Sequence, residues 1–405
     1  MKHIVIIGGG AAGLLAANYA KQENTKVTIL EKNPICGKKI LATGNGKCNY
    51  WNEDQNLKHY HSTHEELIKE FITEDNKTEI MSFFTRLGIY PKIKNGYYYP
   101  SSNQATTIKD ALTKEVLRKN IVVKNNTIVE KVEKVNAEFK IYTSNEIITA
   151  DKVIIATGSK ASPKTGSDGF GYKLLKRFNH QIIEPLPALV QLKTTGKYLK
   201  NWAGIRTDVE VSLYENETLV RSEIGEIQLT DYGISGICVF NLSRNVSIGL
   251  SKNKKEQVKI NFLPFLTKPK EDLTSFISNQ PKRPLKTQLE GFLNSKLVDV
   301  ILTEANIKET KNYNELTDQE KDKLISFLTK FKTEVIGTNS FEQAQVCTGG
   351  IPLTEVNLKT MESKIVKDLY IVGELLDIDG DCGGYNLSIA WISGMLAGIG
   401  SANND

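Results

Sequence analysis

The sequence has few of the features that indicate a disulfide-rich, metal-binding or membrane-spanning protein. Its five cysteines are an odd number, are scattered and form no CxxC pair, so we expect neither a disulfide framework nor a zinc site. No apolar stretch is long enough to span a bilayer. Met1–His3 leads directly into an apolar run with no signal-peptide pattern. These absences predict a cytoplasmic protein.

Histidine is also scarce, but His59, His61 and His64 lie close together in the chain. No carboxylate or cysteine at metal-ligand spacing accompanies them, so we expect no metal. We favour a surface loop that enters a helix over residues 64–73. The net charge is small, at +5, which is compatible with an anionic partner but does not require one. The lysines and arginines between residues 252 and 286 are expected to lie mainly on a solvated face.

What the chain does have is a nucleotide-binding signature at its start. Ile4–Ile7 is a continuous apolar run, typical of a strand buried on both faces. It leads into Gly8-x-Gly10-x-x-Gly13 and an Ala-rich helix. The first glycine allows the tight turn, the second lets a pyrophosphate approach the backbone, and the third lets the helix pack close to the strand. The helix N-terminus then offers free N–H groups to the phosphates.

A second predicted strand, Lys26–Leu30, ends at Glu31. An acidic residue about 20 positions past the glycines is where ribose hydroxyls are held. We therefore expect the three glycines and Glu31 to bind a dinucleotide. The alternative is an unrelated α/β protein with a Gly-rich turn, and the order strand, glycines, helix, strand disfavours it.

The next segment, residues 32–49, is rich in glycine, lysine and small polar residues and has no regular period, which is typical of a functional loop. Its lysines would neutralise phosphates, and its glycines would let a ligand approach the backbone. These residues are Lys38, Lys39, Lys47, Gly44 and Gly46. A solvated basic loop is the alternative.

Two later segments repeat the pattern of an apolar strand followed by glycine. Val153–Ile155 precedes Ala156-Thr157-Gly158, and Leu369–Val372 precedes Gly373-Glu374. Such strand ends pass beside a bound dinucleotide at the mouth of a parallel sheet. The second is followed by a loop and a small-residue helix at Leu387–Gly398. We expect the dinucleotide fold to be assembled from both chain ends, with the middle inserted between them.

The middle of the chain changes character after residues 185–192. Short alternating strands are expected at 209–213, 219–223, 227–229 and 258–262, and a helical pattern at 270–332. Before this region, residues 90–102 alternate aromatic and basic side chains around a glycine, including Tyr97–Tyr99. That segment would either stack a base or substrate, or bury one face of a hairpin.

With these residues in place, the chain resembles the BaiN/RdsA-type family of NAD(P)/FAD-dependent oxidoreductases. These flavoproteins include a bile-acid ring reductase and a ribosomal RNA dihydrouridine synthase. The match runs nearly end to end, and its most specific segments are 39–49, 229–236, 360–364 and 373–386. Family members often carry Arg where this chain has Lys47, and Lys meets a phosphate without Arg's bidentate fork.

The resemblance implies an α/β fold with a Rossmann-like FAD-binding domain of the two-dinucleotide-binding type, an inserted β-rich domain and a small helical domain. The expected boundaries are 1–190 and 345–405 for the FAD-binding domain, 191–265 and 333–344 for the β-rich domain, and 266–332 for the helical domain. Besides the three glycines and Glu31, the residues implied to contact FAD are Ala12, Lys32, Lys38, Thr43, Gly44, Gly46, Thr157, Gly158, Gly373, Glu374, Asp379, Asn386 and Leu387.

The resemblance also implies an enzyme that reduces a polarised C=C bond by hydride transfer from reduced flavin, with a proton supplied by a general acid. Cys347, Cys382 and Tyr385 fall in the flavin-side loops and are the candidates for this acid, with Cys48 as a fourth. Packed or ligand-lining side chains without a proton role are the alternative for each. The sequence has no second dinucleotide-binding fingerprint for a nicotinamide cofactor, so NAD(P)H is expected as a transient donor.

Three functional interpretations stay open. One is reduction of uracil to dihydrouridine in ribosomal RNA, with which the basic excess and Tyr97–Tyr99 are compatible. The second is NAD(P)H-linked reduction of a small apolar enone, which needs an apolar pocket and no salt-sensitive RNA affinity. The third is a non-catalytic flavin-binding sensor.

Overall fold

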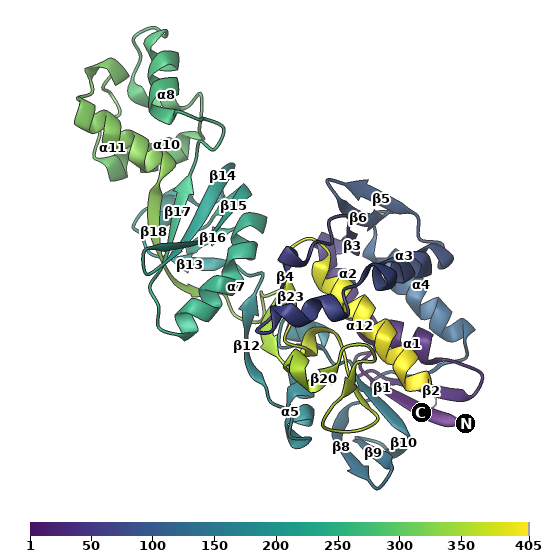
Figure 1. Ribbon diagram of the computed structural model, residues 1–405. Helices are drawn as coiled ribbons and strands as arrows, with labels where there is room; N and C mark the ends of the chain where they lie inside the picture. The colour runs from purple at the N-terminus through teal and green to yellow at the C-terminus, as the bar shows by residue number, and fades with distance from the viewer. Residues whose placement is uncertain (404–405) are drawn as a thin grey trace. The chain divides into compact units, whose positions relative to one another are not determined.

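The computed structural model describes residues 1–403, which form two compact units (Figure 1). The first unit contains Met1–Leu186 and the chain from Gln345 onward, and the second contains Pro187–Ala344. The limits expected from the sequence, after residues 190 and 344, lie close to this division. The finer separation of the middle into a β-rich and a helical domain stays a prediction.

A seven-stranded sheet forms the centre of the first unit. Five neighbouring strands run parallel, and two short antiparallel strands extend one edge. The order is β20 (Val356–Asn357), β21 (Glu362–Ser363), β22 (Leu369–Ile371), β11 (Lys152–Ile155), β1 (Lys2–Ile7), β2 (Thr25–Leu30) and β7 (Val122–Lys124). The run Ile4–Ile7 in β1 is buried on both faces, as its unbroken apolar sequence predicts.

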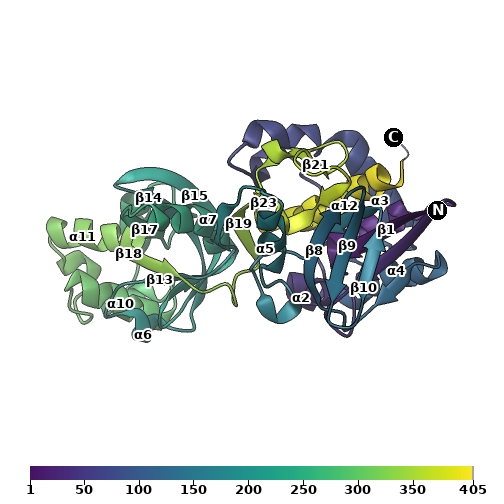
Figure 2. The same ribbon diagram turned by 90° about the horizontal axis from the view of Figure 1, so that it is seen from below.

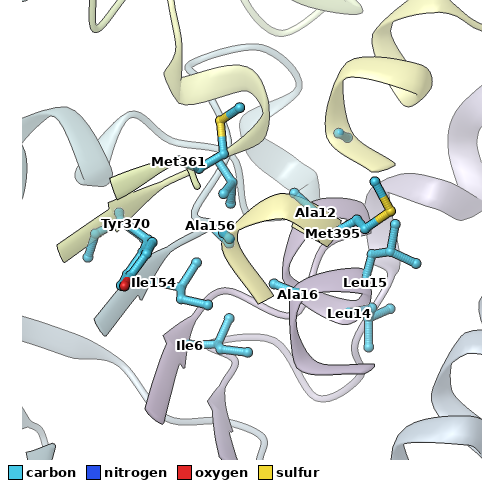
Figure 3. Close-up of a cluster of buried hydrophobic side chains, with 14 of the residues drawn as sticks. Ile6, Ala12, Leu14, Leu15, Ala16, Ile154, Ala156, Met361, Tyr370 and Met395 are labelled. Carbon is cyan, nitrogen blue, oxygen red and sulfur yellow. The ribbon is translucent and has the colours of Figure 1, made fainter. Parts of the chain in front are cut away.

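Two helices from opposite ends of the chain, α1 (Ala11–Ala20) and α12 (Tyr385–Ala402), pack against each other. A Cβ placed on Gly394 would lie 2.4 Å from the carbonyl oxygen of Ala12, so small residues allow this close approach. Figure 3 shows side chains from the sheet and both helices in one buried cluster. Most residues of the long α12 are buried, as its apolar sequence requires. Among the described residues, no helix combines the length and apolar character needed to cross a membrane.

The first unit also contains shorter elements. Its other helices are α2 (Lys38–Ala42), α3 (Glu74–Arg86), α4 (Ala105–Arg118) and α5 (Phe170–Arg177). A three-stranded antiparallel sheet consists of β8 (Val129–Val135), β9 (Glu138–Thr143) and β10 (Ile147–Ala150). Small sheets are formed by β3 (Trp51–Asn52), β6 (Tyr97–Pro100) and β5 (Pro91–Lys94), by β4 (Tyr60–His61) and β23 (Asp379–Gly380), and by β12 (Ile183–Ala188) and β19 (Val346–Gly350).

The second unit is built on a closed β-barrel, visible in Figure 2. Its strand order is β13 (Leu192–Thr194), β16 (Gly233–Ser235), β15 (Thr218–Leu229), β14 (Arg206–Glu215), β17 (Glu256–Asn261) and β18 (Phe331–Thr338). Along β14, Val209, Val211 and Leu213 are fully buried and alternate with more exposed polar residues, which is the pattern of a barrel wall. The helices α6 (Leu199–Trp202) and α7 (Ile237–Ser251) complete this part.

A helical segment is inserted between β17 and β18. It contains α8 (Pro269–Ser278), α9 (Leu285–Leu289), α10 (Ser295–Ala305) and α11 (Asp318–Thr329). Its buried leucines belong to the same hydrophobic cluster as the barrel interior. The barrel and the helical segment therefore share one core.

Two local expectations are wrong, and one helix was not predicted. Residues 219–223 and 227–229 form one strand, β15, because Gly225 continues the pairing opposite Val209. The helix α7 was not expected, since its β-branched and Ser/Asn residues disguise the helical spacing of its buried face. Residues 64–73 do not form an α-helix; only a 3₁₀ helix, η3 (Glu65–Glu70), is present there.

Candidate functional site

The candidate site lies where four parallel strands of the first unit end together. In the sheet register, Ile7 lies opposite both Leu30 and Ile155, and Ile155 lies opposite Ile371. The residues that follow these strands therefore meet at one edge of the sheet. The segments brought together in this way begin at Gly8, Glu31, Ala156 and Val372, which carry many of the residues expected to contact FAD.

The glycine-rich turn between β1 and α1 is too tightly packed for side chains at two positions. Gly8 has a φ of 107°, and a Cβ there would lie 2.3 Å from the carbonyl oxygen of Ala156. A Cβ on Gly13 would lie 1.9 Å from the carbonyl oxygen of Gly8. Both distances are far below van der Waals contact, so the packing of the turn itself requires these glycines.

Gly10 has a different role, because it borders open space at the N-terminus of α1. A Cβ on Gly10 would meet no heavy atom of the described chain within 4 Å. No side chain in residues 1–403 caps α1, and the first turn of the helix contains no acidic residue. The N–H groups of that turn and the positive end of the helix dipole favour an anion. This arrangement fits a pyrophosphate in contact with the backbone.

Glu31 follows β2 and is buried beside the glycine turn. Its Oε2 accepts a hydrogen bond from the N–H of Gly9 at 2.8 Å. Its Oε1 accepts hydrogen bonds from the N–H and the Nδ2 of Asn33, both at 2.7 Å. A carboxylate has about four acceptor positions, so these contacts leave capacity for a ribose hydroxyl.

The loop after α2 has an unusual backbone. In η1 (Thr43–Gly46) and the residues after it, Gly44, Asn45, Gly46 and Cys48 all have φ between 54° and 82°. Left-handed conformations of this kind cost roughly 1–2 kcal/mol for a residue other than glycine, and they cluster at ligand sites. The N–H of Cys48 donates to the carbonyl of Thr43 at 3.0 Å and closes the loop. Gly44 and Gly46, both expected at the cofactor, thus lie in a strained loop.

Lys39 makes contacts that differ from its expected role at a phosphate. Its Nζ lies 2.6 Å from Oε2 of Glu374, and it also donates to the carbonyl of Ala161 at 3.3 Å. Ser159 donates to the same Glu374 oxygen at 2.8 Å. Lys39 therefore joins α2 to the segment after β22, and the prediction that it neutralises a phosphate is corrected. The carboxylate of Glu374 accepts three hydrogen bonds from these two partners, and its contact with FAD stays a prediction.

The other lysines of the loop differ in their surroundings. Lys32 pairs with Asp168 at 2.7 Å, and Lys38 lies 3.4 Å from Oδ1 of Asn33. Lys47 is exposed. Lys38 and Lys47 therefore remain the candidates for a phosphate contact, whereas Lys32 would contribute its backbone.

Thr157 supplies a buried polar atom with unused bonding capacity. Its Oγ1 is buried and has no hydrogen-bond partner among the described residues. It lies directly after β11, next to Gly158, which has a φ of 75°. Buried hydroxyl groups are normally hydrogen-bonded, so an unpaired one at this edge of the sheet fits a ligand contact.

The helix α12 passes beside the same edge of the sheet: the N–H of Gly373, after β22, donates to Oγ of Ser393 at 3.0 Å. Asn386 in the first turn of α12 holds the preceding loop: its Oδ1 accepts from the N–H of Gly380 at 2.9 Å, and its Nδ2 donates to the Gly380 carbonyl at 2.7 Å. Its side-chain amide is therefore largely occupied. Asp379 is buried and Leu387 is partly buried.

Together these features fit FAD. An open helix N-terminus would hold the pyrophosphate, a buried carboxylate would hold the ribose, and an unpaired threonine hydroxyl and a glycine-rich loop border the same edge. The individual contacts stay predictions. Among residues 1–403, no group of three or more His, Cys, Asp or Glu side chains is arranged to hold a metal ion.

The candidates for the general acid are poorly suited to donate a proton near neutral pH. Burial raises the pKa of Cys382 to about 11 and that of Cys48 to about 12, and it raises the pKa of Cys347 as well. Burial likewise raises the pKa of Tyr385 well above its ordinary value. An effective acid has a pKa near the working pH, so the structure offers no support for these four residues in that role.

A cluster beside α12 was missed by sequence reasoning. The buried carboxylate of Asp381 lies 3.0 Å from Nδ1 of His59 through one oxygen and 3.0 Å from Nε2 of His61 through the other. The ring of His59 also stacks on Tyr385, with centroids 4.6 Å apart. The expectation of a simple surface loop at these histidines is therefore wrong. The only sequence signal was the alternation of aspartates at 377, 379 and 381.

The fold and this site define a Rossmann-type FAD-binding protein. The family model described as "HI0933-like protein Rossmann domain" matches residues 2–400, and the chain belongs to this family. The matched residues therefore include the barrel and the helical segment as well as the sheet.

The curated relatives are enzymes. The chain is 37% identical over 99% of its length to a protein of Clostridium scindens named 3-dehydro-bile acid delta(4,6)-reductase, of which it covers 99%. It is 28% identical over 96% of its length to the ribosomal RNA dihydrouridine synthases of Escherichia coli and Haemophilus influenzae, covering 95% and 96% of them. The expected family is thus confirmed, and the protein is an FAD-dependent oxidoreductase.

Proposed function

We propose that this protein reduces a polarised C=C bond of a small, apolar enone with a hydride from reduced FAD. The observation that carries the proposal is the cradle at the sheet edge, with an uncapped α1, the open space at Gly10 and the buried Glu31. The names of its relatives, a delta(4,6)-reductase and dihydrouridine synthases, both describe chemistry at a carbon–carbon double bond. Bound FAD supplies the hydride, and the protein supplies orientation and electrostatics.

The chain's own residues have three tasks in this reaction. The glycine turn and Glu31 bind the dinucleotide, and the strained loop 43–48 shapes the space beside it. The N-terminus of α12 offers the positive end of a helix dipole, which would stabilise negative charge on the reduced cofactor. A proton donor must then serve the second alkene carbon.

A small substrate is favoured by the pairing of basic side chains in the second unit. Several lysines between residues 252 and 286 contact acids: Lys254 with Glu215 and Lys286 with Asp299 are 2.7 and 2.6 Å apart. Lys270 likewise pairs with Asp322. Lysines neutralised in this way contribute less to phosphate binding. The higher identity to the bile-acid reductase points in the same direction.

Reduction of uracil in ribosomal RNA is the second candidate, and one feature favours it. The hairpin β5–β6 carries three partly exposed tyrosines, Tyr97–Tyr99. It also carries two exposed lysines, Lys92 and Lys94. Aromatic and basic side chains in one hairpin suit a splayed base and its phosphate.

The experiment uses the FAD-loaded protein under anaerobic conditions. It is mixed with NADH or NADPH and either a 3-oxo-4-ene steroid or ribosomal RNA, and the products are analysed by mass spectrometry. We expect the steroid to gain two hydrogens and the RNA to remain unchanged. Dihydrouridine in the RNA would instead support the second candidate. Retention of FAD with no reduction of either substrate, even after chemical reduction of the flavin, would support a non-catalytic sensor.

A further inference from the structure

The hairpin β5–β6 is held against the loop that leads into α12. Its strand β6 pairs with β3, so that Tyr98 lies opposite Trp51 and Tyr97 lies opposite Asn52. The Nδ2 of Asn52 then donates a hydrogen bond to the carbonyl of Gly383 at 2.9 Å. Because Gly383 lies two residues before α12, these contacts fix the hairpin beside the N-terminus of that helix.

The strand register divides the side chains of the hairpin between two faces. Tyr99 lies opposite Lys92, and Tyr97 lies opposite Lys94. Directly opposed residues share a face, and so do residues two positions apart in one strand. These four residues therefore form one surface, which we call the tyrosine–lysine face. Tyr98 lies on the other face, where it packs against the buried cluster of the first unit.

The tyrosine–lysine face borders two loops expected at the flavin. A Cβ placed on Gly44 would lie 3.6 Å from Cε1 of Tyr99, and one placed on Gly383 would lie 3.0 Å from Cε1 of Tyr97. Gly44 belongs to the strained loop after α2, and Gly383 belongs to the loop before α12. Burial, followed by the nearby Cys382, raises the pKa of Tyr99, so its ring stays neutral. The face thus presents aromatic rings next to both loops.

The two lysines of this face lack a counter-charge. Lys92 and Lys94 are exposed, and neither pairs with a carboxylate within residues 1–403. Lys39, by contrast, is neutralised by Glu374. Unpaired ammonium groups on one side of a short strand attract an anion, and their long, flexible stems let both reach it. Two charges suit one anionic group better than an extended RNA backbone, for which affinity grows with the number of phosphates neutralised.

We propose that the tyrosine–lysine face positions a substrate whose apolar, enone-bearing ring system carries an anionic substituent. Tyr97 and Tyr99 contact the ring system, and Lys92 and Lys94 bind the anionic group. The inference rests on the proposed function and narrows its substrate class. These residues position the substrate, and no proton or electron passes through them.

A binding measurement tests this assignment without turnover. Equilibrium dialysis compares the binding of two ligands to the oxidised, FAD-loaded protein: a 3-oxo-4-ene steroid with a side-chain carboxylate, and its methyl ester, which shares the ring system but is neutral. We expect wild type to bind the acid more tightly than the ester, and this preference should shrink as the salt concentration rises. Lys92→Gln with Lys94→Gln should weaken binding of the acid roughly 2- to 30-fold and leave binding of the ester unaffected.

Matched variants separate the effect of charge from an effect on the fold. Lys92→Arg with Lys94→Arg should retain the preference for the acid, since both charges are kept. Lys114→Gln with Lys197→Gln removes the same charge from two exposed positions elsewhere and should bind as wild type does. Tyr99→Leu should weaken binding of the acid and the ester alike, roughly 3- to 10-fold, because both lose contact with the ring.

Three outcomes would overturn the assignment. Equal affinity of wild type for the acid and the ester would show that no cation meets the substituent. An equal loss of acid binding in the variant of Lys114 and Lys197 would reduce the effect to net charge. Unchanged acid binding in the glutamine variant of Lys92 and Lys94, with slower flavin reduction by NADPH or weaker binding of ribosomal RNA, would assign the face to another anion. The proposed function fails separately, if chemically reduced flavin is reoxidised by ferricyanide but by neither steroid.

Discussion

The carboxylate of Glu31 is joined to the backbone N–H of Gly9 by a buried hydrogen bond of 2.8 Å. This contact connects the end of β2 to the turn that follows β1, so the group expected at the ribose also fixes the turn expected at the pyrophosphate. Two functions of the cradle therefore meet at one side chain, which makes it a sensitive site for testing the cofactor assignment.

Replacing Glu31 with Gln is expected to weaken FAD binding roughly 10- to 100-fold, because a charge-assisted hydrogen bond is worth about 1.5–3 kcal/mol. The amide keeps the size of the side chain but cannot accept through both oxygens. Titration of FAD into the unloaded protein, followed by flavin fluorescence, measures the effect. Glu23→Gln, at an exposed position, is the control and should bind as wild type does. Equal affinity of all three proteins would place the ribose elsewhere.

The glycines of the turn predict two different outcomes for the same substitution. Gly10→Ala adds a Cβ where the described chain has no atom within 4 Å, so the unloaded protein should keep its Tm but lose FAD. Gly13→Ala places a Cβ 1.9 Å from a carbonyl oxygen and should lower the Tm itself. Thermal unfolding of the unloaded proteins and the FAD content after reconstitution distinguish the two. An FAD-replete Gly10→Ala protein would argue against a pyrophosphate at this position.

Glu256 in the barrel predicts a pH dependence of stability. Both of its carboxylate oxygens are buried without a hydrogen-bond partner among the described residues, and burial, with Glu215 nearby, raises its pKa to about 7. Between about pH 4.5 and pH 7 the unfolded chain releases this proton while the folded chain retains it, so the folded state loses stability as the pH rises. The expected loss is on the order of 3 kcal/mol.

Glu256→Gln should remove most of this slope and raise the Tm above neutral pH. The measurement is the Tm of wild type and variant at about pH 5 and about pH 8. Glu334→Gln, at an exposed position on β18, is the control and should retain the wild-type slope. A wild-type slope in Glu256→Gln would show that this carboxyl group ionises normally in the folded state.

Features encoded within a few residues were predictable from the sequence. The spacing of Gly8, Gly10 and Gly13 after an apolar strand predicted the turn that the structure shows, and Glu31 lies beside that turn as expected. The joining of both chain ends in one sheet was predicted from the repeated pattern of a strand followed by glycine. These signals work because strand burial and backbone conformation depend on local sequence.

Contacts between distant residues were not predictable in the same way. The basic loop predicted a phosphate contact for Lys39, but the structure pairs this lysine with Glu374, which lies 335 residues away in the sequence. Asp381 is 322 residues from His59, and no local pattern connects them. In both cases the fold brings together segments whose side chains are unremarkable by themselves. The identity of a partner therefore required the fold.

The most direct measurement of the central claim is a single turnover. The FAD-loaded protein is reduced by chemical titration without oxygen, mixed with a 3-oxo-4-ene steroid, and analysed for flavin colour and product together. We expect the yellow colour to return as one saturated product forms for each flavin oxidised. A protein that takes up no FAD, or a reduced flavin that stays bleached while steroid and RNA are both unchanged, would contradict flavin-dependent reduction of a C=C bond.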